Sequence, residues 1–263
     1  MRANLLARRG LFPFARPLAL LVVGTIAIGS AAAAEVRILS AGAVKAPLSK
    51  RIEALREAEG IEAVATYATA GAVRERLAGD ERADIVILPR EALDALAQKG
   101  AIVEDSRQAL GEVGVGIAVR QGAPLPDIAT PDALRATLLA AKSIVYVDPE
   151  KGTSGRHVEA MLRTLGIAEA VRAKTTRLDG GYVVEPVARG EIEIGLHQIS
   201  EILPVPGVQL VGPLPPTLQK TTVYEAAVLK DAASPHEAAA SIRLLTTPAS
   251  RAVFVQSGFA PPR

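Results

Sequence analysis

The stretch Ala83-Asp84-Ile85-Val86-Ile87-Leu88 decides the fold class of this chain. After Asp84 its residues are apolar without alternation, which is typical of a strand buried on both faces of a parallel sheet. Helical stretches are expected on either side of it, at 72–78 and 92–99. Shorter runs rich in β-branched residues precede it at 36–39 and 63–67. This alternation of strands and helices predicts an α/β fold with mainly parallel sheets.

The same alternation begins again farther along the chain. The first set also includes an expected helix at 48–58 and a fourth strand at 115–119. In the second set, strands are expected at 143–147, 192–196 and 224–229, and helices at 131–141, 156–165, 236–245 and 249–256. Residues 35–263 are enough for one large domain or for two lobes, each a mainly parallel sheet flanked by helices. We expect residues 35–116 together with 208–263 to form one lobe and residues 117–207 to form the other. Proline-rich segments around 203–216 are expected to be stiff connections between the lobes.

Residues 1–34 have the composition of an export signal. Four arginines without an acidic residue come first, an apolar run follows at 18–28, and small residues lead to Ala34. The apolar run is shorter than the roughly 20 residues that span a bilayer. We therefore expect cleavage near Ala34 and a periplasmic protein without stable membrane insertion, with an uncleaved anchor as the alternative. The pair Arg8-Arg9 leaves the general and the twin-arginine export routes open.

Charge and cysteine content exclude several classes of protein. Beyond residue 34, 26 basic residues stand against 28 acidic ones, so the net charge is −2. The sequence has no cluster of basic residues with aromatic partners, so we do not expect it to bind nucleic acid. The absence of cysteine excludes disulfides, thiolate zinc sites and cysteine nucleophiles. Because the three histidines are scattered and no nucleotide or haem motif is present, we expect neither a metal nor a cofactor.

Four expected strand-to-helix junctions consist largely of small residues. They lie at 39–43, 67–71, 148–155 and 179–182. In open α/β sheets, ligands lie beyond the carboxyl ends of the strands. Small residues let an anion approach the unpaired N–H groups in the first turn of a helix. The junctions therefore predict one shared site for a small anion, although Thr153 or Ser154 could serve only as a helix N-cap.

Polar side chains near the junctions allow two interpretations each. His197 follows an expected strand and could face either a ligand or the core. Arg156, Arg74 and Lys45 could neutralise an anion, but charged helix residues are more often simply solvated.

Several segments, taken in their order along the chain, resemble one known family. They are YATAGAVRERL at 67–77, ADIVI at 83–87, Asp148-Pro149 followed by Ser154-Gly155-Arg156, VARGEIEIG at 187–195 and AVFVQSGF at 252–259. This order is similar to that of the periplasmic molybdate-binding proteins of ABC importers, which have the type II solute-binding fold. The resemblance implies two lobes that close by a hinge on an oxyanion, and an ABC permease as a partner.

The resemblance also implies that hydroxyl and backbone N–H groups hold the anion, with some of the family's ligand side chains changed. The serine after the first strand falls at Gly42 or is displaced to Ser40, and the cleft tyrosine falls at Gln198. The other positions fall at Thr69 or Ala70, at Ser154 and at Gly180. Altogether, the residues expected to contact the ligand are Ser40, Gly42, Thr69, Ala70, Thr153, Ser154, Arg156, Gly180, Gly181, His197 and Gln198.

A divergent branch with this kind of sequence is similar to the periplasmic aconitate isomerases, which share the same scaffold. That resemblance implies a cofactor-free isomerase of a small tricarboxylate, whose cleft needs a general base and a general acid. The available acid–base residues are His197, Glu201, Glu185 and Tyr224, with Arg156, Lys45 and Arg74 as carboxylate clamps. Two kinds of function thus remain open. One is capture of an oxyanion or small organic acid, for an importer or as a signal to a receptor; the other is isomerisation.

Overall fold

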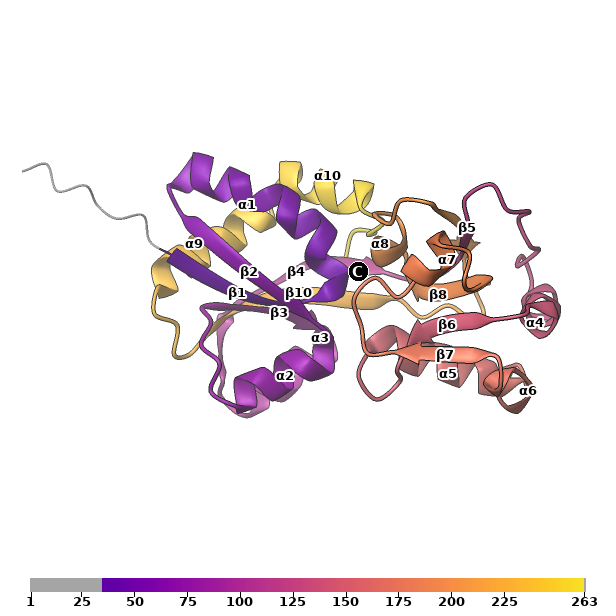
Figure 1. Cartoon of the computed structure of the whole chain (residues 1–263). Coiled ribbons are helices and arrows are strands. Elements are labelled where there is room, and N and C mark those ends of the chain that lie inside the picture. Colours follow the sequence, from indigo (N-terminus) through magenta and orange to yellow (C-terminus); the bar gives the residue numbers. More distant parts are fainter. Residues whose placement is uncertain (1–34, 263) are drawn as a thin grey trace, which may run out of the picture. The chain divides into compact units, whose positions relative to one another are not determined.

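Residues 35–262, which the computed structural model describes, form two five-stranded sheets with helices on both faces (Figure 1). The expected two-lobed α/β fold is confirmed. The expected export signal at 1–34 lies outside the described residues. Across 35–262, every helix is too short or too polar to cross a bilayer.

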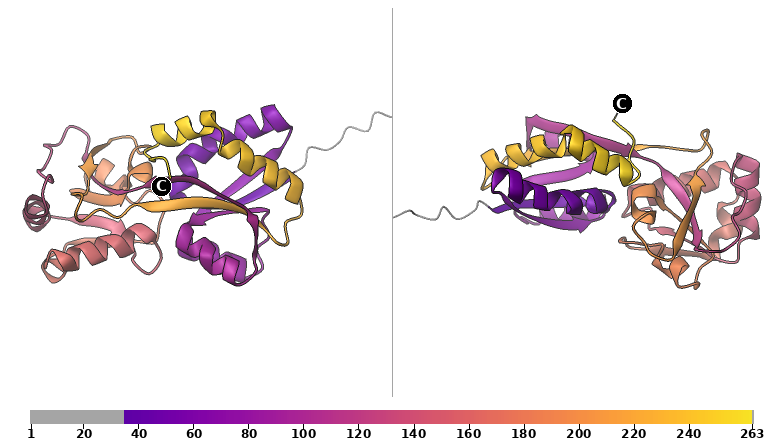
Figure 2. Two further views of the ribbon diagram at one scale, coloured as in Figure 1. Left: turned by 180° about the vertical axis from the view of Figure 1, so that it is seen from behind. Right: turned by 90° about the horizontal axis from the view of Figure 1, so that it is seen from above.

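The first lobe is built on a sheet with the strand order β2-β1-β3-β10-β4. Strand β1 pairs in parallel with β2 and β3, whereas β10 runs antiparallel to β3 and β4. The strands are β1 (Glu35–Ala41), β2 (Glu62–Ala68), β3 (Ile85–Pro89), β4 (Ile102–Val113) and β10 (Thr222–Leu229). One face carries α1 (Lys45–Glu59), α9 (Pro235–Leu245) and α10 (Pro248–Gln256), and the other carries α2 (Ala70–Ala78) and α3 (Arg90–Gln98) (Figures 1 and 2).

The second lobe is built on a sheet with the order β7-β6-β8-β5-β9. Its strands are β5 (Val115–Arg120), β6 (Ile144–Val147), β7 (Thr175–Leu178), β8 (Ile194–Gln198) and β9 (Val208–Pro213). Helices α4 (Pro131–Ala140), α5 (Thr153–Thr164) and α6 (Ala168–Arg172) lie on one face. Helices α7 (Glu185–Ala188) and α8 (Ile199–Ile202) lie on the other.

The two sheets repeat one topology, although the sequence contains no exact internal repeat. Each has three parallel strands, β2-β1-β3 or β7-β6-β8, followed by two strands in antiparallel pairing. The sheets are therefore mixed, with a parallel half that ends at the site. Strand β9 pairs with β5, so the proline-rich region around 203–216 contains a strand of the second sheet. The chain returns to the first lobe only after residue 213.

The chain crosses between the lobes twice, at Gly114 and over residues 214–221. The side-chain amide of Gln219 connects the two crossings. It donates to the carbonyl of Val115 at 2.7 Å and accepts from the N–H of the same residue at 3.0 Å. A Cβ on Gly114 would lie 2.8 Å from Gln219 Nε2, so this contact requires the glycine.

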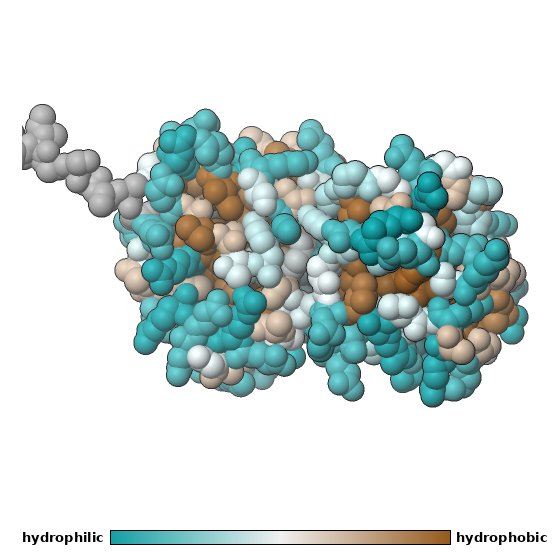
Figure 3. Space-filling model, in the orientation of Figure 1, coloured by the Kyte–Doolittle hydropathy of each residue, from teal (hydrophilic) through white to brown (hydrophobic). Residues whose placement is uncertain are grey.

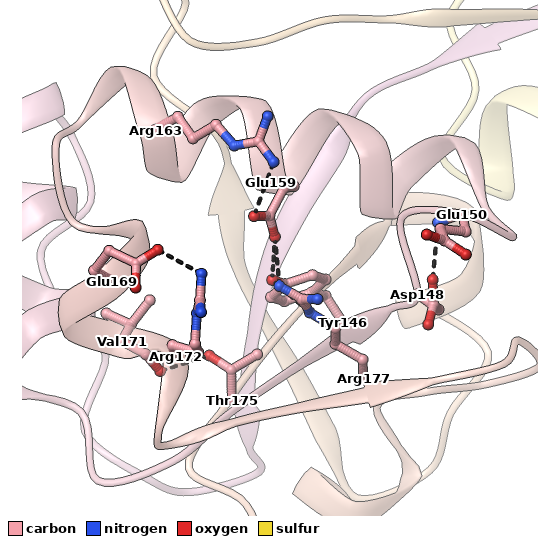
Figure 4. Close-up of polar contacts among 10 residues, drawn as sticks. All are labelled: Tyr146, Asp148, Glu150, Glu159, Arg163, Glu169, Val171, Arg172, Thr175 and Arg177. Carbon is pink, nitrogen blue, oxygen red and sulfur yellow. Dashed lines mark hydrogen bonds and ion pairs between the residues drawn. The ribbon is translucent and has the colours of Figure 1, made fainter.

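Polar side chains fix α5 to the second sheet (Figure 4). The hydroxyl of Tyr146 on β6 donates to Glu159 on α5 at 2.8 Å, and Arg177 on β7 donates to the same carboxylate at 2.9 Å. Burial raises the pKa of Tyr146, so its hydroxyl remains a donor at neutral pH. The start of α5, at the end of β6, is thereby held in place.

Each lobe has its own apolar core. One buried cluster packs β1, β3 and β10 against the helices of the first lobe, and two smaller clusters lie on the second sheet. The face in Figure 3 is mostly hydrophilic, with apolar areas on both lobes. Among the described residues, no buried cluster contains strands of both sheets. The lobes are therefore joined by the two crossings and by contacts around the cleft.

The first turn of α5 packs so closely on β6 that it requires glycine. A Cβ on Gly155 would overlap the carbonyl oxygen of Val147, which is backbone and cannot move aside easily. We expect Gly155→Ala to lower the free energy of unfolding in urea by about 1–3 kcal/mol. Gly212→Ala is the matched control, because its Cβ would meet only Ile128 Cδ1 at 3.6 Å. Equal losses in both variants would contradict the packing argument.

Candidate functional site

The four small-residue junctions line one cavity between the two sheets. Its volume is about 140 Å³, well below the roughly 300–1,000 Å³ of sites for drug-sized ligands. The cavity therefore suits a ligand of few atoms. Most residues predicted from the sequence line it: Gly42, Thr69, Ala70, Thr153, Ser154, Gly180, Gly181, His197, Gln198, Glu201 and Tyr224.

Four residues that the sequence analysis expected at the site lie outside the lining of the cavity. Ser40 is fully buried in β1, and its hydroxyl donates to the carbonyl of Ala41 at 3.1 Å. Arg156 and Glu185 are exposed and lie outside the lining. Arg156 is on the solvent side of α5, because the apolar residues of that helix take the inner side. Arg74, a proposed clamp, is likewise exposed on α2 and outside the lining.

Two tyrosines of the lining were not among the predicted site residues. Tyr67 belongs to the first lobe and Tyr182 to the second, and both occur within the small-residue junctions. The ammonium of Lys45 lies 5.9 Å from the ring centroid of Tyr67 and 4.9 Å from that of Tyr182. Cations are attracted to aromatic faces at such distances. Among the described residues of the lining, Lys45 is the one lysine or arginine.

Helices α2 and α5 begin at the cavity, where first-turn N–H groups lack partners within the helix. Thr69 caps α2 by accepting the N–H of Ala72 at 3.3 Å. The buried hydroxyl of Thr153, at the start of α5, has no hydrogen-bond partner among the described residues. A bound ligand with an acceptor oxygen would satisfy this hydroxyl.

The lobes touch around the cavity through contacts that have a glycine on one side. The N–H of Gly71 in the first lobe donates to the carbonyl of Lys151 in the second at 3.3 Å. A Cβ on Gly180 would lie 2.6 Å from Thr69 Cγ2, and one on Gly42 would lie 2.7 Å from Glu201 Oε1. Because these contacts join the two lobes, the lobes are closed around the cavity.

A buried imidazole and a buried carboxylate form the centre of the site. Nε2 of His197, at the end of β8, lies 3.4 Å from Oε1 of Glu201, four residues later in α8. The same nitrogen lies 3.1 Å from the carbonyl of Gly181, which can only accept, so Nε2 carries a hydrogen. Nδ1 lies 3.3 Å from the hydroxyl of Ser154.

The surroundings allow His197 to gain and lose a proton. Burial lowers its pKa, but the charge of Glu201 and the hydrogen bonds to Glu201 and Gly181 raise it by more, so the net pKa is raised. The hydroxyl of Ser154 can donate to a neutral Nδ1 or accept from a protonated one. The two forms of the ring therefore both have partners.

A second polar group closes the other side of the cavity. The amide of Gln198 donates to the hydroxyls of Thr222 and Tyr224, each at 3.4 Å. Burial raises the pKa of Tyr224, which keeps this hydroxyl neutral. The buried Oε1 of Gln198 has no partner among the described residues. Within 35–262, no three His, Asp or Glu side chains are grouped in a way that could hold a metal ion.

Two α/β lobes that are joined by two crossings and closed around a small polar cavity define a two-lobed solute-binding protein. The chain belongs to the family described as bacterial extracellular solute-binding protein, whose sequence model matches residues 36–260.

Known proteins of two kinds are similar to this chain. An aconitate isomerase of Pseudomonas sp. is 32% identical over 248 residues, which are 92% of this chain and 94% of the relative. The periplasmic molybdate-binding protein of Azotobacter vinelandii has a TM-score of 0.75 at 14% identity and covers 87% of this chain and 100% of its own. The sulfate-binding protein SubI of Mycobacterium tuberculosis H37Rv has a TM-score of 0.70 at 18% identity, covering 87% of each chain. At these identities the solved structures share the fold.

The pKa of His197 provides a direct test of the pair. We expect Glu201→Gln to lower it, because the amide removes the negative charge while the burial remains. Because the folded-state pKa lies above the ordinary value of about 6.5, protonated His197 stabilises the wild-type fold fully below that pH. This stabilisation is lost as the pH rises through the folded pKa.

NMR titration of the histidine ring protons measures the shift, with His157 and His236 as internal references. Glu185→Gln is the control, since it removes an exposed carboxylate outside the cavity. An unchanged pKa of His197 in Glu201→Gln would rule out the coupling.

Proposed function

We propose that this protein is a cofactor-free isomerase of a small unsaturated tricarboxylate of the aconitate type. The observation that carries the proposal is the buried pair of His197 and Glu201 in the wall of the cavity. A general acid and a general base in contact with one small ligand are what a proton shift between two carbons requires.

The mixed polar and apolar lining of the cavity favours an organic acid over a tetrahedral oxyanion. Lys45 is the one lysine or arginine in the described lining, and it lies over tyrosine rings. The lining also includes apolar side chains, at Ala41, Ala43, Ala68, Ala70 and Val147. This mixture suits a ligand that has both hydrocarbon and carboxylate parts.

The reaction we propose is a shift of one proton along an allylic system. Glu201 takes a proton from the methylene group, the C–H electrons form a new C=C bond, and the old C=C bond moves its electrons into the adjacent carboxylate. Glu201, now protonated, gives a proton to the former vinyl carbon and returns to the carboxylate. One C–H bond breaks and another forms, so no oxidant or reductant is needed.

The negative charge that builds up on the substrate carboxylate needs fixed hydrogen-bond donors. The unpartnered hydroxyl of Thr153 and the first-turn N–H groups of α5 are available for this role. Protonated His197, beside Glu201, keeps the pair neutral overall when the carboxylate is ionised. The relative named as an aconitate isomerase, which is matched over nearly its whole length, supports this assignment.

A second candidate function is capture of a small anion for an ABC importer. The family and the closed, hinged lobes support it. The importer hypothesis predicts tight binding without turnover, whereas the isomerase hypothesis predicts conversion of the ligand to product.

Incubation of the purified protein with cis- or trans-aconitate in D2O, followed by proton NMR, tests the proposal. We expect interconversion in the presence of EDTA, with deuterium entering the product at carbon. Glu201→Gln should lower kcat by about 10²-fold or more, and the control Glu185→Gln should leave it unchanged. Binding of the tricarboxylate without turnover would contradict the isomerase and favour the importer role. A rise in melting temperature with molybdate or tungstate alone would contradict the substrate class.

We also propose that the protein is exported to the periplasm and loses its first 34 residues. The arginine-rich start, apolar run and alanines before Glu35 support this proposal. The expected outcome is a periplasmic chain whose intact mass corresponds to residues 35–263. A periplasmic or membrane-bound chain that retains residues 1–34 would contradict cleavage. Replacing Arg8-Arg9 by lysines distinguishes the routes, because it should block only twin-arginine export.

A further inference from the structure

A second crevice between the two lobes adjoins the cavity. It lies between α1 and α10 of the first lobe and α8, with the turn after it, of the second. Lys45 and Tyr182 line the cavity and also the crevice. These two side chains therefore form the partition between them, and the ammonium of Lys45 lies 4.9 Å from the ring centroid of Tyr182.

The crevice contains a buried polar group that nothing in the fold satisfies. Ser200 on α8 is 1% exposed, and its hydroxyl has no hydrogen-bond partner among the described residues. This residue lines the crevice and not the cavity. An unsatisfied buried hydroxyl costs stability unless a ligand or water completes its hydrogen bonds.

The charge of the crevice is positive. Lys45 and Lys50 of α1 line it, and no carboxylate side chain is part of its lining. Within 35–262, neither lysine takes part in an ion pair with a carboxylate. Two ammonium groups without a carboxylate partner, together with an unsatisfied hydroxyl, match the needs of a small carboxylate.

We propose that this crevice is a second, weaker binding site for the small carboxylate ligand and that the ligand enters the cavity through it. The ligand class rests on the function proposed above. Lys45 serves both sides, since its flexible side chain can leave the ring of Tyr182 and follow a carboxylate into the cavity. The contact between an exposed ammonium and an aromatic ring is weak enough for this exchange.

Titration calorimetry with propane-1,2,3-tricarboxylate tests the proposal, because this saturated analogue cannot isomerise. We expect a tight event in the cavity and a weaker one in the crevice that fades as salt is added. Lys50→Gln and Ser200→Ala should each weaken the second event by about fivefold, with the tight event unchanged. Lys142→Gln is the matched control, since it removes an exposed lysine far along the sequence in the second lobe.

Turnover provides an independent readout. We expect Lys50→Gln to lower kcat/KM for aconitate by about the same factor without changing kcat, because Lys50 touches the entering ligand and not the reacting one. A single binding event at all concentrations would overturn the second site, as would a weak event that ignores both substitutions. If only the weak, Lys50-dependent event occurs, the second site stands and the proposed function of the cavity fails.

Discussion

The site depends on close contact between two lobes at positions where one side has no side chain. Gly42, Gly71 and Gly180 meet Glu201, Lys151 and Thr69 across the cleft, and a methyl group at Gly42 or Gly180 would collide with its partner. With the lobes in contact at these points, His197 and Glu201 are buried, and burial strengthens the attraction between an imidazolium and a carboxylate.

The closed cavity brings together an imidazole, a carboxylate and hydrogen-bond donors that have no partner among the described residues. Glu201 and His197 come from one strand end and the short helix after it, so their spacing is set locally by the backbone. The donors come from another element, the start of α5, which Tyr146, Glu159 and Arg177 hold to the sheet. The absence of a side chain at Gly42 leaves room for the Glu201 carboxylate, because a Cβ there would occupy the same space.

The sequence predicted the elements whose patterns are strong. The unbroken apolar run of β3 and the small-residue junctions gave the fold class and most of the cavity lining. The sequence pattern did not predict β4, because this strand carries Glu104, Asp105 and Arg107. Such charges are tolerated in a strand at the edge of a sheet. The sequence did not reveal that Ser40 is buried outside the cavity lining, because β1 runs on to Ala41, beyond the expected strand end at residue 39. Tyr182 lines the cavity and contacts Lys45 of the other lobe, and no local pattern in the sequence reveals such a contact.

The amide of Gln219 determines how the two lobes can move. It holds both the N–H and the carbonyl of Val115, so sliding one crossing past the other would break both bonds at once. Bending of the two crossings together keeps both bonds, so this amide favours bending over sliding. Lobes that bend about the same two crossings face each other in the same register whenever they close. The residues that meet across the cleft, such as Gly71 and Lys151, are therefore brought back to the same partners each time the lobes close.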